Sequence, residues 1–253
     1  RSPRHRSSQA SGLDALEMAL RLLHLEPGSE VVVPAVSAAA TVIAVRRAGL
    51  EPVFADVDPS TALMSLASVE RVIGRSTRAV ILVHLYGHVS SPEVWSDFCS
   101  SYGLTLIEDC AQAHGAKWRG RSAGTFGTAS AFSFYPTKNL GACGDAGALV
   151  VSNETLANEA RQMRNYGQRA RYEHVSYGMN SRLDEVQAAI LRGRLTRLDE
   201  ENRLRRHIAE VYRREINSPE ISLLAEPLEP ENHVYHLFVG RVARRDSLRR
   251  SLA

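Results

Sequence analysis

The chain is poor in the features that mark several protein classes. It has three cysteines, an odd number without a CxxC pair, so we expect neither a disulfide framework nor a structural zinc or other metal site. No apolar run approaches the ~20 residues of a membrane-spanning helix, so we expect no membrane partner. Sparse, unpaired cysteines are typical of a reducing compartment, and we therefore expect a cytoplasmic protein.

Charge of one sign and aromatic side chains are also scarce. Lysine and arginine together number 31, aspartate and glutamate 28, and the aromatic content is 6%. The small basic excess lies mostly at the two ends, and no basic stripe is interleaved with aromatics, so we expect no nucleic-acid partner. The hydrophobic content of 44% is enough for a large core.

Apolar periodicity predicts helices and strands in alternation. A helix begins after Ser11, a capping residue, and ends before Pro27 and Gly28. The other predicted helices cover 38–48, 68–73, 92–102 and 154–166, and the predicted strands cover 30–33, 52–57, 79–84, 104–107, 129–135 and 147–152. This alternation predicts an α/β fold with a mostly parallel central sheet flanked by helices.

The two ends depart from this pattern. Residues 1–9 are too polar for the strand that such a fold would place before its first helix. Residues 183–216 predict one long helix or two abutting helices, and 234–242 predict a strand. Residues 245–253 resemble the beginning of a helix, so we expect the chain to be a fragment of a longer protein.

Lys138 is the most informative single residue. It lies on a connection rich in glycine and proline between two predicted buried strands, where a lysine is costly to bury unless it is paired or used. Upstream, the strand at 104–107 is followed by Asp109. Such a carboxylate and a lysine on a later loop match a pyridoxal phosphate (PLP) enzyme, in which the lysine forms a Schiff base and the carboxylate keeps the ring nitrogen protonated.

Other residues could complete such a site. Ligands of parallel sheets gather at the carboxyl ends of the strands, where His84 and Asp109 both fall. The helix that starts at Gly12 and Leu13 offers free N–H groups to a phosphate, although it could be an ordinary capped helix. Considered alone, Asp109 could be an ordinary carboxylate at a strand end or a helix cap, and Lys138 could be a surface lysine on a turn. For His114 we expect an ordinary hydrogen-bonded histidine, at the surface or in the core.

Residues 107–151 resemble the signature of the DegT/DnrJ family, above all in FYPTKNLGACGDAG around Lys138. These are PLP-dependent nucleotide-sugar aminotransferases of the aspartate-aminotransferase fold (fold type I). Further similar blocks cover nearly the whole chain: 11–15, 27–34, 83–87, 164–167, 178–191 and 233–238. The resemblance implies a PLP-binding large domain over residues 1–197, followed by a linking helix and an incomplete small α+β domain over 198–253.

The resemblance also implies roles for residues of the site. Lys138 would form the Schiff base with PLP and carry protons during the reaction. Asp109 would bind the pyridine nitrogen and Gln112 the phenolic oxygen. Three residues are implied at the phosphate: Gly12, Leu13 and Ser133.

Three further residues are implied outside this group. Asn180 would reach the phosphate of a neighbouring subunit, so the active sites would be shared across a homodimer. Tyr135 and His236 would line the sugar site. One position departs from the family pattern, because Ala38 stands where many relatives stack an aromatic ring on the cofactor, a contact worth roughly 0.5–1.5 kcal/mol.

The activity implied is transfer of an amino group from glutamate, or less readily glutamine, to a keto-sugar nucleotide. The Lys138 block looks most like enzymes that act on keto-6-deoxyhexoses in antibiotic or surface-glycan pathways. One alternative is an impaired or truncated relative with a binding or regulatory role, which Ala38 and the two ends favour. The other is a PLP-dependent sugar dehydratase, but these replace the lysine by histidine, so Lys138 argues against it.

Overall fold

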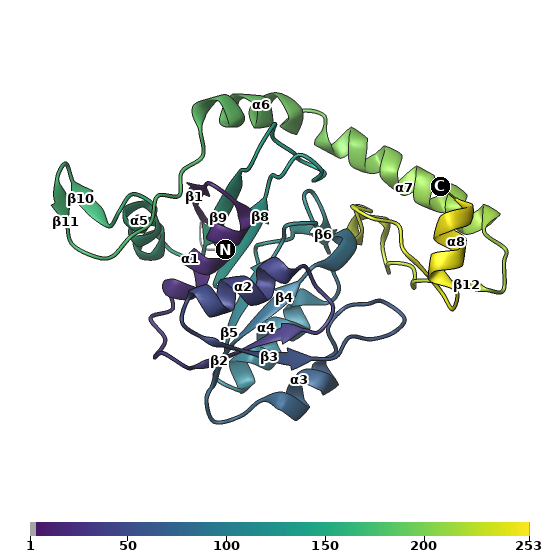
Figure 1. The fold of residues 1–253 in the computed structure, drawn as a ribbon, viewed down its shortest axis with the longest axis horizontal. Helices are drawn as coiled ribbons and strands as arrows, with labels where there is room; N and C mark the ends of the chain where they lie inside the picture. The colour runs from purple at the N-terminus through teal and green to yellow at the C-terminus, as the bar shows by residue number, and fades with distance from the viewer. Residues whose placement is uncertain (1–3, 253) are drawn as a thin grey trace.

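A seven-stranded sheet occupies the centre of the computed structural model, which describes residues 4–252 (Figure 1). The strand order is β1-β9-β8-β5-β4-β2-β3, and only β9 runs antiparallel to its neighbours. The strands are β1 (His5–Gln9), β2 (Glu30–Pro34), β3 (Glu51–Ala55), β4 (Thr77–Val83), β5 (Thr105–Asp109), β8 (Ala129–Ser133) and β9 (Gly147–Val151). The predicted mostly parallel α/β sheet is therefore confirmed.

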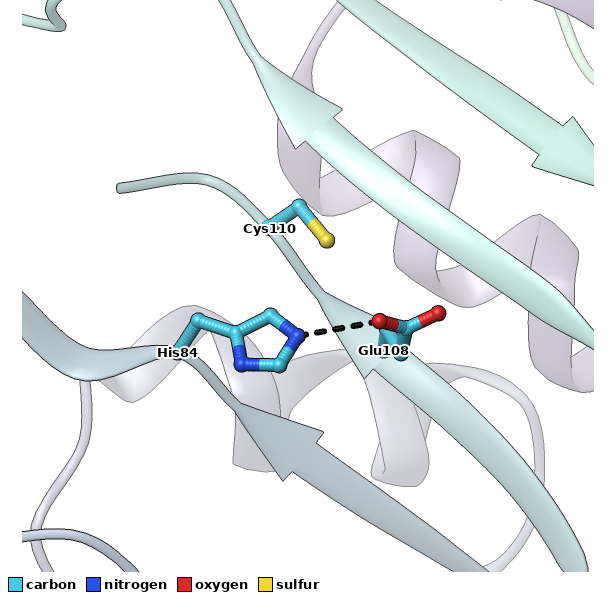
Figure 2. A group of neighbouring side chains, drawn as sticks. All are labelled: His84, Glu108 and Cys110. Carbon is cyan, nitrogen blue, oxygen red and sulfur yellow. Dashed lines mark hydrogen bonds and ion pairs between the residues drawn. The ribbon is translucent and has the colours of Figure 1, made fainter. Parts of the chain in front are cut away.

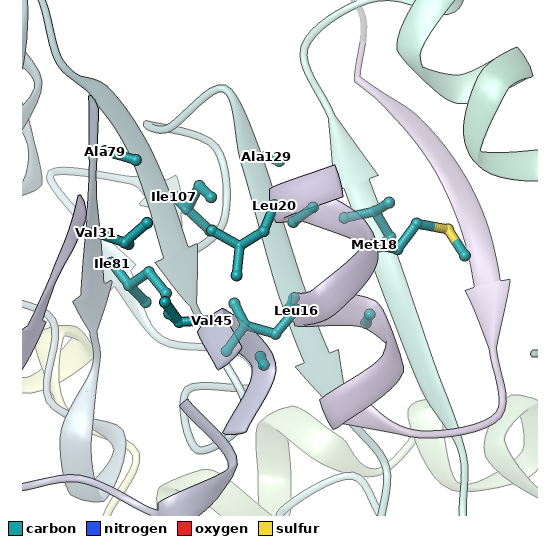
Figure 3. Packing of buried hydrophobic residues seen from close by; sticks show 14 of the residues in the cluster. Leu16, Met18, Leu20, Val31, Val45, Ala79, Ile81, Ile107 and Ala129 are labelled. Carbon is teal, nitrogen blue, oxygen red and sulfur yellow. The ribbon is translucent and has the colours of Figure 1, made fainter. Parts of the chain in front are cut away.

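Helices cover both faces of the sheet. One face packs against α1 (Gly12–Arg21), α2 (Ala39–Arg47) and α5 (Glu154–Met163), and Figure 3 shows part of this core. The other face packs against α3 (Leu66–Val72) and α4 (Pro92–Ser101). Successive residues of a strand point to opposite faces, so in β4 Ile81 joins the first core and Leu82 the second.

The chain then leaves the sheet. Two abutting helices, α6 (Glu185–Leu195) and α7 (Leu198–Glu215), follow each other along one edge of the molecule in Figure 1, as one of the two sequence alternatives predicted. Two short 3₁₀ helices, η1 (Leu85–Gly87) and η2 (Pro230–Asn232), and the helix α8 (Arg245–Ser251) complete the helical elements. Among the helices formed by residues 4–252, none is long and apolar enough to cross a membrane.

Three two-stranded ribbons lie outside the main sheet. They are formed by β6 (Lys117–Trp118) with β7 (Arg121–Ser122), β10 (Gln168–Ala170) with β11 (Glu173–His174), and β12 (Ile221–Leu223) with β13 (Gly240–Val242). The β10–β11 ribbon projects from the body of the molecule beside α5 (Figure 1).

The prediction that residues 1–9 form no strand was wrong for the part that the structure describes; residues 1–3 lie outside it. His5–Gln9 pairs with β9 at the edge of the sheet. An edge strand needs backbone partners on one side only, and its polar side chains find bonds of their own. Gln9, which is fully buried, donates to the Ser7 hydroxyl at 3.1 Å.

The strand predicted over 234–242 was also wrong for most of its length. Only Gly240–Val242 pairs as a strand, with Ile221–Leu223. Val234 is fully buried in a separate apolar cluster, and its N–H donates to the Gly87 carbonyl at 3.0 Å. The apolar pattern of this segment therefore reflects docking against the η1 turn rather than a regular strand.

Candidate active site

One pocket gathers most of the predicted site residues at the carboxyl end of the sheet. Six of them line it: Gly12, Leu13, Asp109, Gln112, Ser133 and Lys138. Ala38, at the start of α2, lines the same pocket. The cavity itself is small, about 90 Å³. Residues from five separate segments thus face one cavity at the carboxyl end of the sheet.

The first turn of α1 forms one end of the pocket. Ser11 caps the helix, since its hydroxyl accepts from Asp14 N at 3.1 Å. The N–H groups of Gly12 and Leu13 have no acceptor among the described residues, as expected at a helix start. A Cβ atom at Gly12 would lie 2.5 Å from the Ser133 Cβ. The missing side chain therefore lets helix and strand approach, and this leaves two N–H groups and a hydroxyl at a cradle suited to a phosphate.

Asp109 stands at the other side of the pocket. Its Oδ2 accepts from the Thr41 hydroxyl and its Oδ1 from Ala111 N, both at 3.1 Å. Burial raises the pKa of Asp109 above its ordinary value, although these two donors and the charge of Lys138 oppose the rise. A cationic N–H placed against this carboxylate would relieve the cost of its burial, so Asp109 suits a protonated ring nitrogen.

Lys138 is half-buried at the mouth of the pocket. Its backbone N–H donates to the Tyr135 carbonyl at 2.8 Å, which closes the turn that carries it. Burial lowers the pKa of the Lys138 ammonium, while the charge of Asp109 raises it. The net lowering favours a neutral amine, which is the form that attacks a carbonyl carbon or accepts a proton.

Gln112 has one end of its amide occupied. Its Oε1 accepts from Tyr86 N at 2.5 Å, and Tyr86 has a left-handed backbone with φ 60°. Because a backbone N–H can only donate, the amide oxygen must face Tyr86, and the NH₂ group faces elsewhere. Gln112 is thus oriented to donate a hydrogen bond, as contact with a phenolic oxygen requires.

The structure does not bring the three remaining predicted residues into this pocket. Asn180 is exposed and pairs with Asn165 in an isolated β-bridge. Tyr135 is 50% exposed on the turn before Lys138. His236 is partly buried, and its Nδ1 lies 3.1 Å from the Oδ1 of Asn139, the neighbour of Lys138.

His84 lies at the predicted edge of the sheet but faces away from the pocket. Its Nε2 pairs with Glu108 Oε1 at 3.0 Å, as Figure 2 shows. The strand alternation explains this, because Glu108 and Asp109 are consecutive and point to opposite faces. His84 thus lies at the carboxyl edge of the sheet, as predicted, but does not line the pocket.

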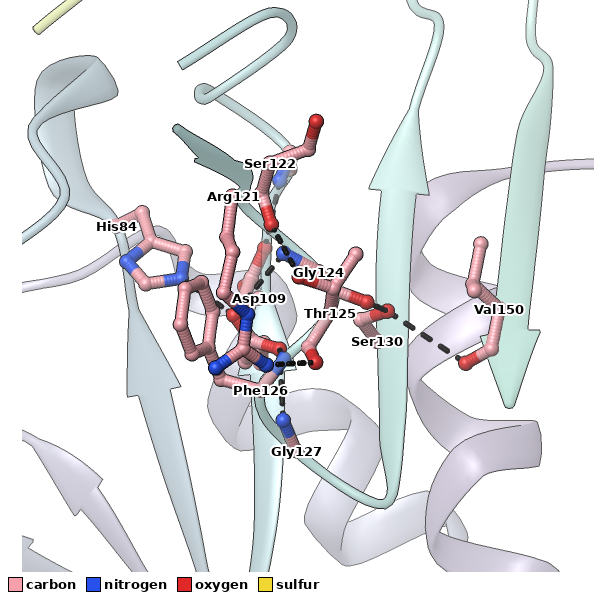
Figure 4. Close-up of polar contacts among 12 residues, drawn as sticks. His84, Asp109, Arg121, Ser122, Gly124, Thr125, Phe126, Gly127, Ser130 and Val150 are labelled. Carbon is pink, nitrogen blue, oxygen red and sulfur yellow. Dashed lines mark hydrogen bonds and ion pairs between the residues drawn. The ribbon is translucent and has the colours of Figure 1, made fainter. Parts of the chain in front are cut away.

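Glu108 is the centre of a buried hydrogen-bond network (Figure 4). Besides His84, its two oxygens accept from three backbone N–H groups of the following loop at 2.8–3.0 Å: Gly124, Phe126 and Gly127. Cys110 lies close to His84 and Glu108, near enough for the three to surround an ion. Since N–H donors already occupy both carboxylate oxygens, we interpret this cluster as structural.

His114 lies in the core of the protein. It is buried at 3% exposure between two phenylalanine rings, and neither ring nitrogen has a hydrogen-bond partner among the described residues. Burial lowers its pKa to about 3, so the ring is neutral. His114 is thus a core residue, as predicted, and its neutral ring packs against Phe132 and Phe134 without a well-formed hydrogen bond.

Sequence reasoning missed Thr41 as a functional residue. It is fully buried and donates to Asp109, and it shares a contact of 2.9 Å with the Ser37 hydroxyl. A signal was present, because a threonine in the first turn of a helix that follows a strand faces the carboxyl edge of the sheet. Its role would be to hold the Asp109 carboxylate in one orientation.

Comparison with known proteins agrees with this site. Residues 3–253 match the DegT/DnrJ/EryC1/StrS aminotransferase family. The chain belongs to the DegT/DnrJ/EryC1/StrS aminotransferase family. It is 44% identical over 245 residues to the dTDP-3-amino-3,4,6-trideoxy-alpha-D-glucose transaminase of Streptomyces venezuelae, a match that covers 96% of this chain and 64% of that protein.

Solved structures of the family are similar throughout the described fold. The S. venezuelae DesV structure, in complex with a ketimine intermediate, aligns with a TM-score of 0.93 at 43% identity over 98% of this chain and 67% of that one. NtdA from Bacillus subtilis, with bound cofactor PMP, aligns with a TM-score of 0.86 at 33% identity over 96% of this chain and 56% of that one. The chain therefore spans 56–67% of the length of these relatives.

Proposed function

We propose that this protein is a PLP-dependent aminotransferase that moves an amino group from glutamate to a nucleotide-linked keto sugar of the keto-6-deoxyhexose class. Membership of an aminotransferase family and similarity to a dTDP-sugar transaminase support the reaction class and the substrate class. The observation that carries the proposal is the single pocket lined by both Lys138 and Asp109. Burial lowers the pKa of Lys138, which favours the neutral amine that such a reaction needs.

The residues present fit the cofactor. The free N–H groups of Gly12 and Leu13, with the Ser133 hydroxyl, would hold the phosphate. Asp109 would face the ring nitrogen, held in place by Thr41. PLP bound there supplies an electron sink that stabilises negative charge at the substrate carbon.

The chemistry of the chain's own groups then follows. Lys138 would hold the cofactor covalently and, as a free amine, would carry a proton between two carbons of the substrate and cofactor. Burial lowers its pKa from that of an ordinary lysine, which favours the neutral amine that accepts a proton. Gln112 would donate to the phenolic oxygen.

We also propose that two copies of the chain share their active sites, with Asn180 reaching the phosphate of the partner. Asn180 is exposed and lies outside the pocket of its own chain. Three large apolar side chains on the same projecting segment are also exposed: Tyr172, Val175 and Tyr177. Such a patch is typical of a protein interface, and a monomeric mass for the PLP-loaded protein by analytical ultracentrifugation would contradict this part.

Three further assignments are proposals as well. We divide the chain into a PLP-binding unit over 1–197 and a linking helix with part of a smaller unit over 198–253, in keeping with the break between α6 and α7. Tyr135 and His236 are proposed to line the sugar site. The cytoplasm is the proposed compartment, supported by the free state of all three cysteines.

The unusual lysine content of the chain allows a direct test. Lys138 and Lys117 are its only lysines. We expect borohydride reduction of the PLP-loaded protein to fix the cofactor on Lys138 alone, as mapped by peptide mass spectrometry. Lys138→Ala should abolish this label and lower transamination of glutamate at least about 1,000-fold, because the covalent anchor and the proton carrier are both lost.

Lys117→Ala is the matched control. Lys117 is 40% exposed at its side chain and pairs with Glu231 at 3.3 Å, away from the pocket. This variant should keep both the label and the activity. A label on Lys117, or full activity in Lys138→Ala, would overturn the proposal.

A further inference from the structure

A chain of buried amide groups connects Lys138 to the segment that carries His236. Asn139, 7% exposed, donates through Nδ2 to Asn202 Oδ1 at 2.8 Å and to the Val234 carbonyl at 3.0 Å. Asn202, 1% exposed on α7, donates through Nδ2 to the His114 carbonyl at 2.8 Å. The Oδ1 of Asn139 meets the Nδ1 of His236 at 3.1 Å.

The direction of every bond in this chain is fixed by its ends. The His114 carbonyl can only accept, so Asn202 must point its NH₂ group there and its oxygen toward Asn139. The Val234 carbonyl can only accept as well, so Asn139 must point its NH₂ group toward it. The oxygen of Asn139 therefore faces His236, and the Nδ1 of His236 must carry the hydrogen.

Two glycines hold the same arrangement in place. A Cβ atom at Gly115 would lie 2.7 Å from the Asn202 Nδ2, so the amide can reach the His114 carbonyl only because residue 115 has no side chain. A Cβ atom at Gly87 would lie 2.7 Å from Val234 Cγ2 and 3.3 Å from His236 N. Both glycines have a positive φ, 82° and 93°, which other residues rarely adopt.

We propose that Asn139 and Asn202 are positioning residues that lock His236 as its Nδ1–H tautomer, so that its Nε2 is a hydrogen-bond acceptor for the substrate beside Lys138. This inference rests on the proposed function for the identity of the substrate. A ring fixed in one tautomer gives the sugar site a hydrogen-bond acceptor in one fixed direction. Asn202, which fixes it through Asn139, lies on α7, a helix outside the sheet.

The charge state of the ring agrees with this role. Burial, together with the charges of Lys138 and Arg205, lowers the pKa of His236 to about 4. The ring is therefore neutral at physiological pH. It cannot take the proton that Lys138 carries, and it retains the lone pair on Nε2.

The tautomer can be read without catalysis. Long-range ¹H–¹⁵N NMR of ¹⁵N-histidine-labelled protein, with His236→Gln to assign the signals, should show Nδ1 protonated and Nε2 bare. In Asn139→Ala and Asn202→Leu, the same ring should populate both tautomers. Asn217→Ala, a change at an exposed asparagine, is the control and should leave the spectrum unchanged. An unprotonated Nδ1 in the unmodified protein, or an unchanged tautomer in both Asn139→Ala and Asn202→Leu, overturns the proposal.

Two substitutions at His236 separate the roles of its nitrogens. The amide of His236→Gln can place an oxygen near the Nε2 position, while the amide of His236→Asn occupies the Nδ1 position and offers no acceptor at Nε2. We expect His236→Asn to lose about 10- to 100-fold in kcat/KM for the keto sugar, and His236→Gln to lose clearly less. Equal losses, or better function of the asparagine variant, overturn the role of Nε2.

The amino-donor half of the reaction distinguishes this proposal from the proposed function. All variants should still bind PLP covalently and react with glutamate at a rate within about threefold of the unmodified protein, because the lock acts on the sugar acceptor. If the unmodified protein does not react with glutamate at all, the proposed function fails while the tautomer result stands. If glutamate and sugar reactions fall together in the His236 variants, the acceptor role fails.

Discussion

Glu108 and Asp109 are neighbours in sequence and opposites in environment. Glu108 is fully buried and accepts from His84 and from three backbone N–H groups. Asp109 accepts from one hydroxyl and one N–H at the wall of an open pocket. Burial acts to raise the pKa of both, but in Glu108 the His84 and N–H donors reverse the effect, whereas in Asp109 the rise remains.

The difference teaches how one strand end can serve two purposes. A carboxylate with all its lone pairs satisfied stabilises the loop around it, because removing it would leave several buried donors without partners. A carboxylate that is short of donors is costly in the folded protein and is suited to receive one from a ligand. Alternation along β5 assigns the first role to Glu108 and the second to Asp109.

The largest expected effect that separates the two is on catalysis. Asp109→Asn should lower transamination of glutamate by about 1,000-fold or more, because a neutral amide cannot hold the ring nitrogen in its protonated form. The free energy of unfolding of the cofactor-free protein should stay the same or rise slightly, since a buried charge is removed. Urea denaturation checks the second point, and a large loss of stability would show that Asp109 is structural instead.

Glu108→Gln should show the opposite profile. Its new NH₂ group would face donors that need an acceptor, and we expect the free energy of unfolding to fall by about 3–5 kcal/mol. The residual activity of folded protein should change far less than in Asp109→Asn. Glu215→Gln, at an exposed position at the end of α7, is the control and should stay within about 0.5 kcal/mol.

The smallest expected effect is a difference between Glu108 and Asp109 in how their contributions to the free energy of unfolding change at acid pH. The folded-state pKa of Glu108 is lowered, so its contribution is present above its unfolded pKa of ~4.3 and is lost as pH falls through the lower folded value. The folded-state pKa of Asp109 is raised, so its destabilising charge disappears as pH falls through the folded value toward the unfolded ~3.9. Urea denaturation at a series of pH values, from neutral to acid, measures the free energy of unfolding of each variant relative to the unmodified protein. The loss in Glu108→Gln and any gain in Asp109→Asn should both become smaller as the pH falls, and the change should begin at a higher pH for Asp109→Asn. A difference that does not depend on pH would contradict the assignment of that residue.

Features of the fold and the site could be predicted from the sequence where they depend on residues close together in the chain. Lys138 and Asp109 could be singled out because each comes within three residues of the end of an apolar run that predicts a strand. Glu108 could have been separated from Asp109 by the same alternation, since consecutive strand residues cannot share a face. The position of His84 at a strand end was predictable, but its pairing with Glu108 depends on which face of the sheet its side chain takes.

The remaining features depend on contacts distant in sequence. His5–Gln9 becomes a strand because β9, far along the chain, offers it an edge, and its own polar residues give no periodic signal. Asn139 and Asn202 are 63 residues apart, and no sequence motif or apolar periodicity predicts the hydrogen bond between their buried amides. The segment 234–242 has an apolar pattern typical of a strand, but packing against Gly87 decides its shape.

The close approach of Gly12 to Ser133 has a consequence for how such a protein can change. The space between them cannot hold even a methyl group, as the 2.5 Å separation from a Cβ at Gly12 shows. Elsewhere the lining consists of small side chains, in Ser37, Ala38 and Ala40. Substitution can therefore reshape the pocket at the start of α2, where a larger side chain has no such close neighbour as Ser133, while Gly12 has to stay glycine.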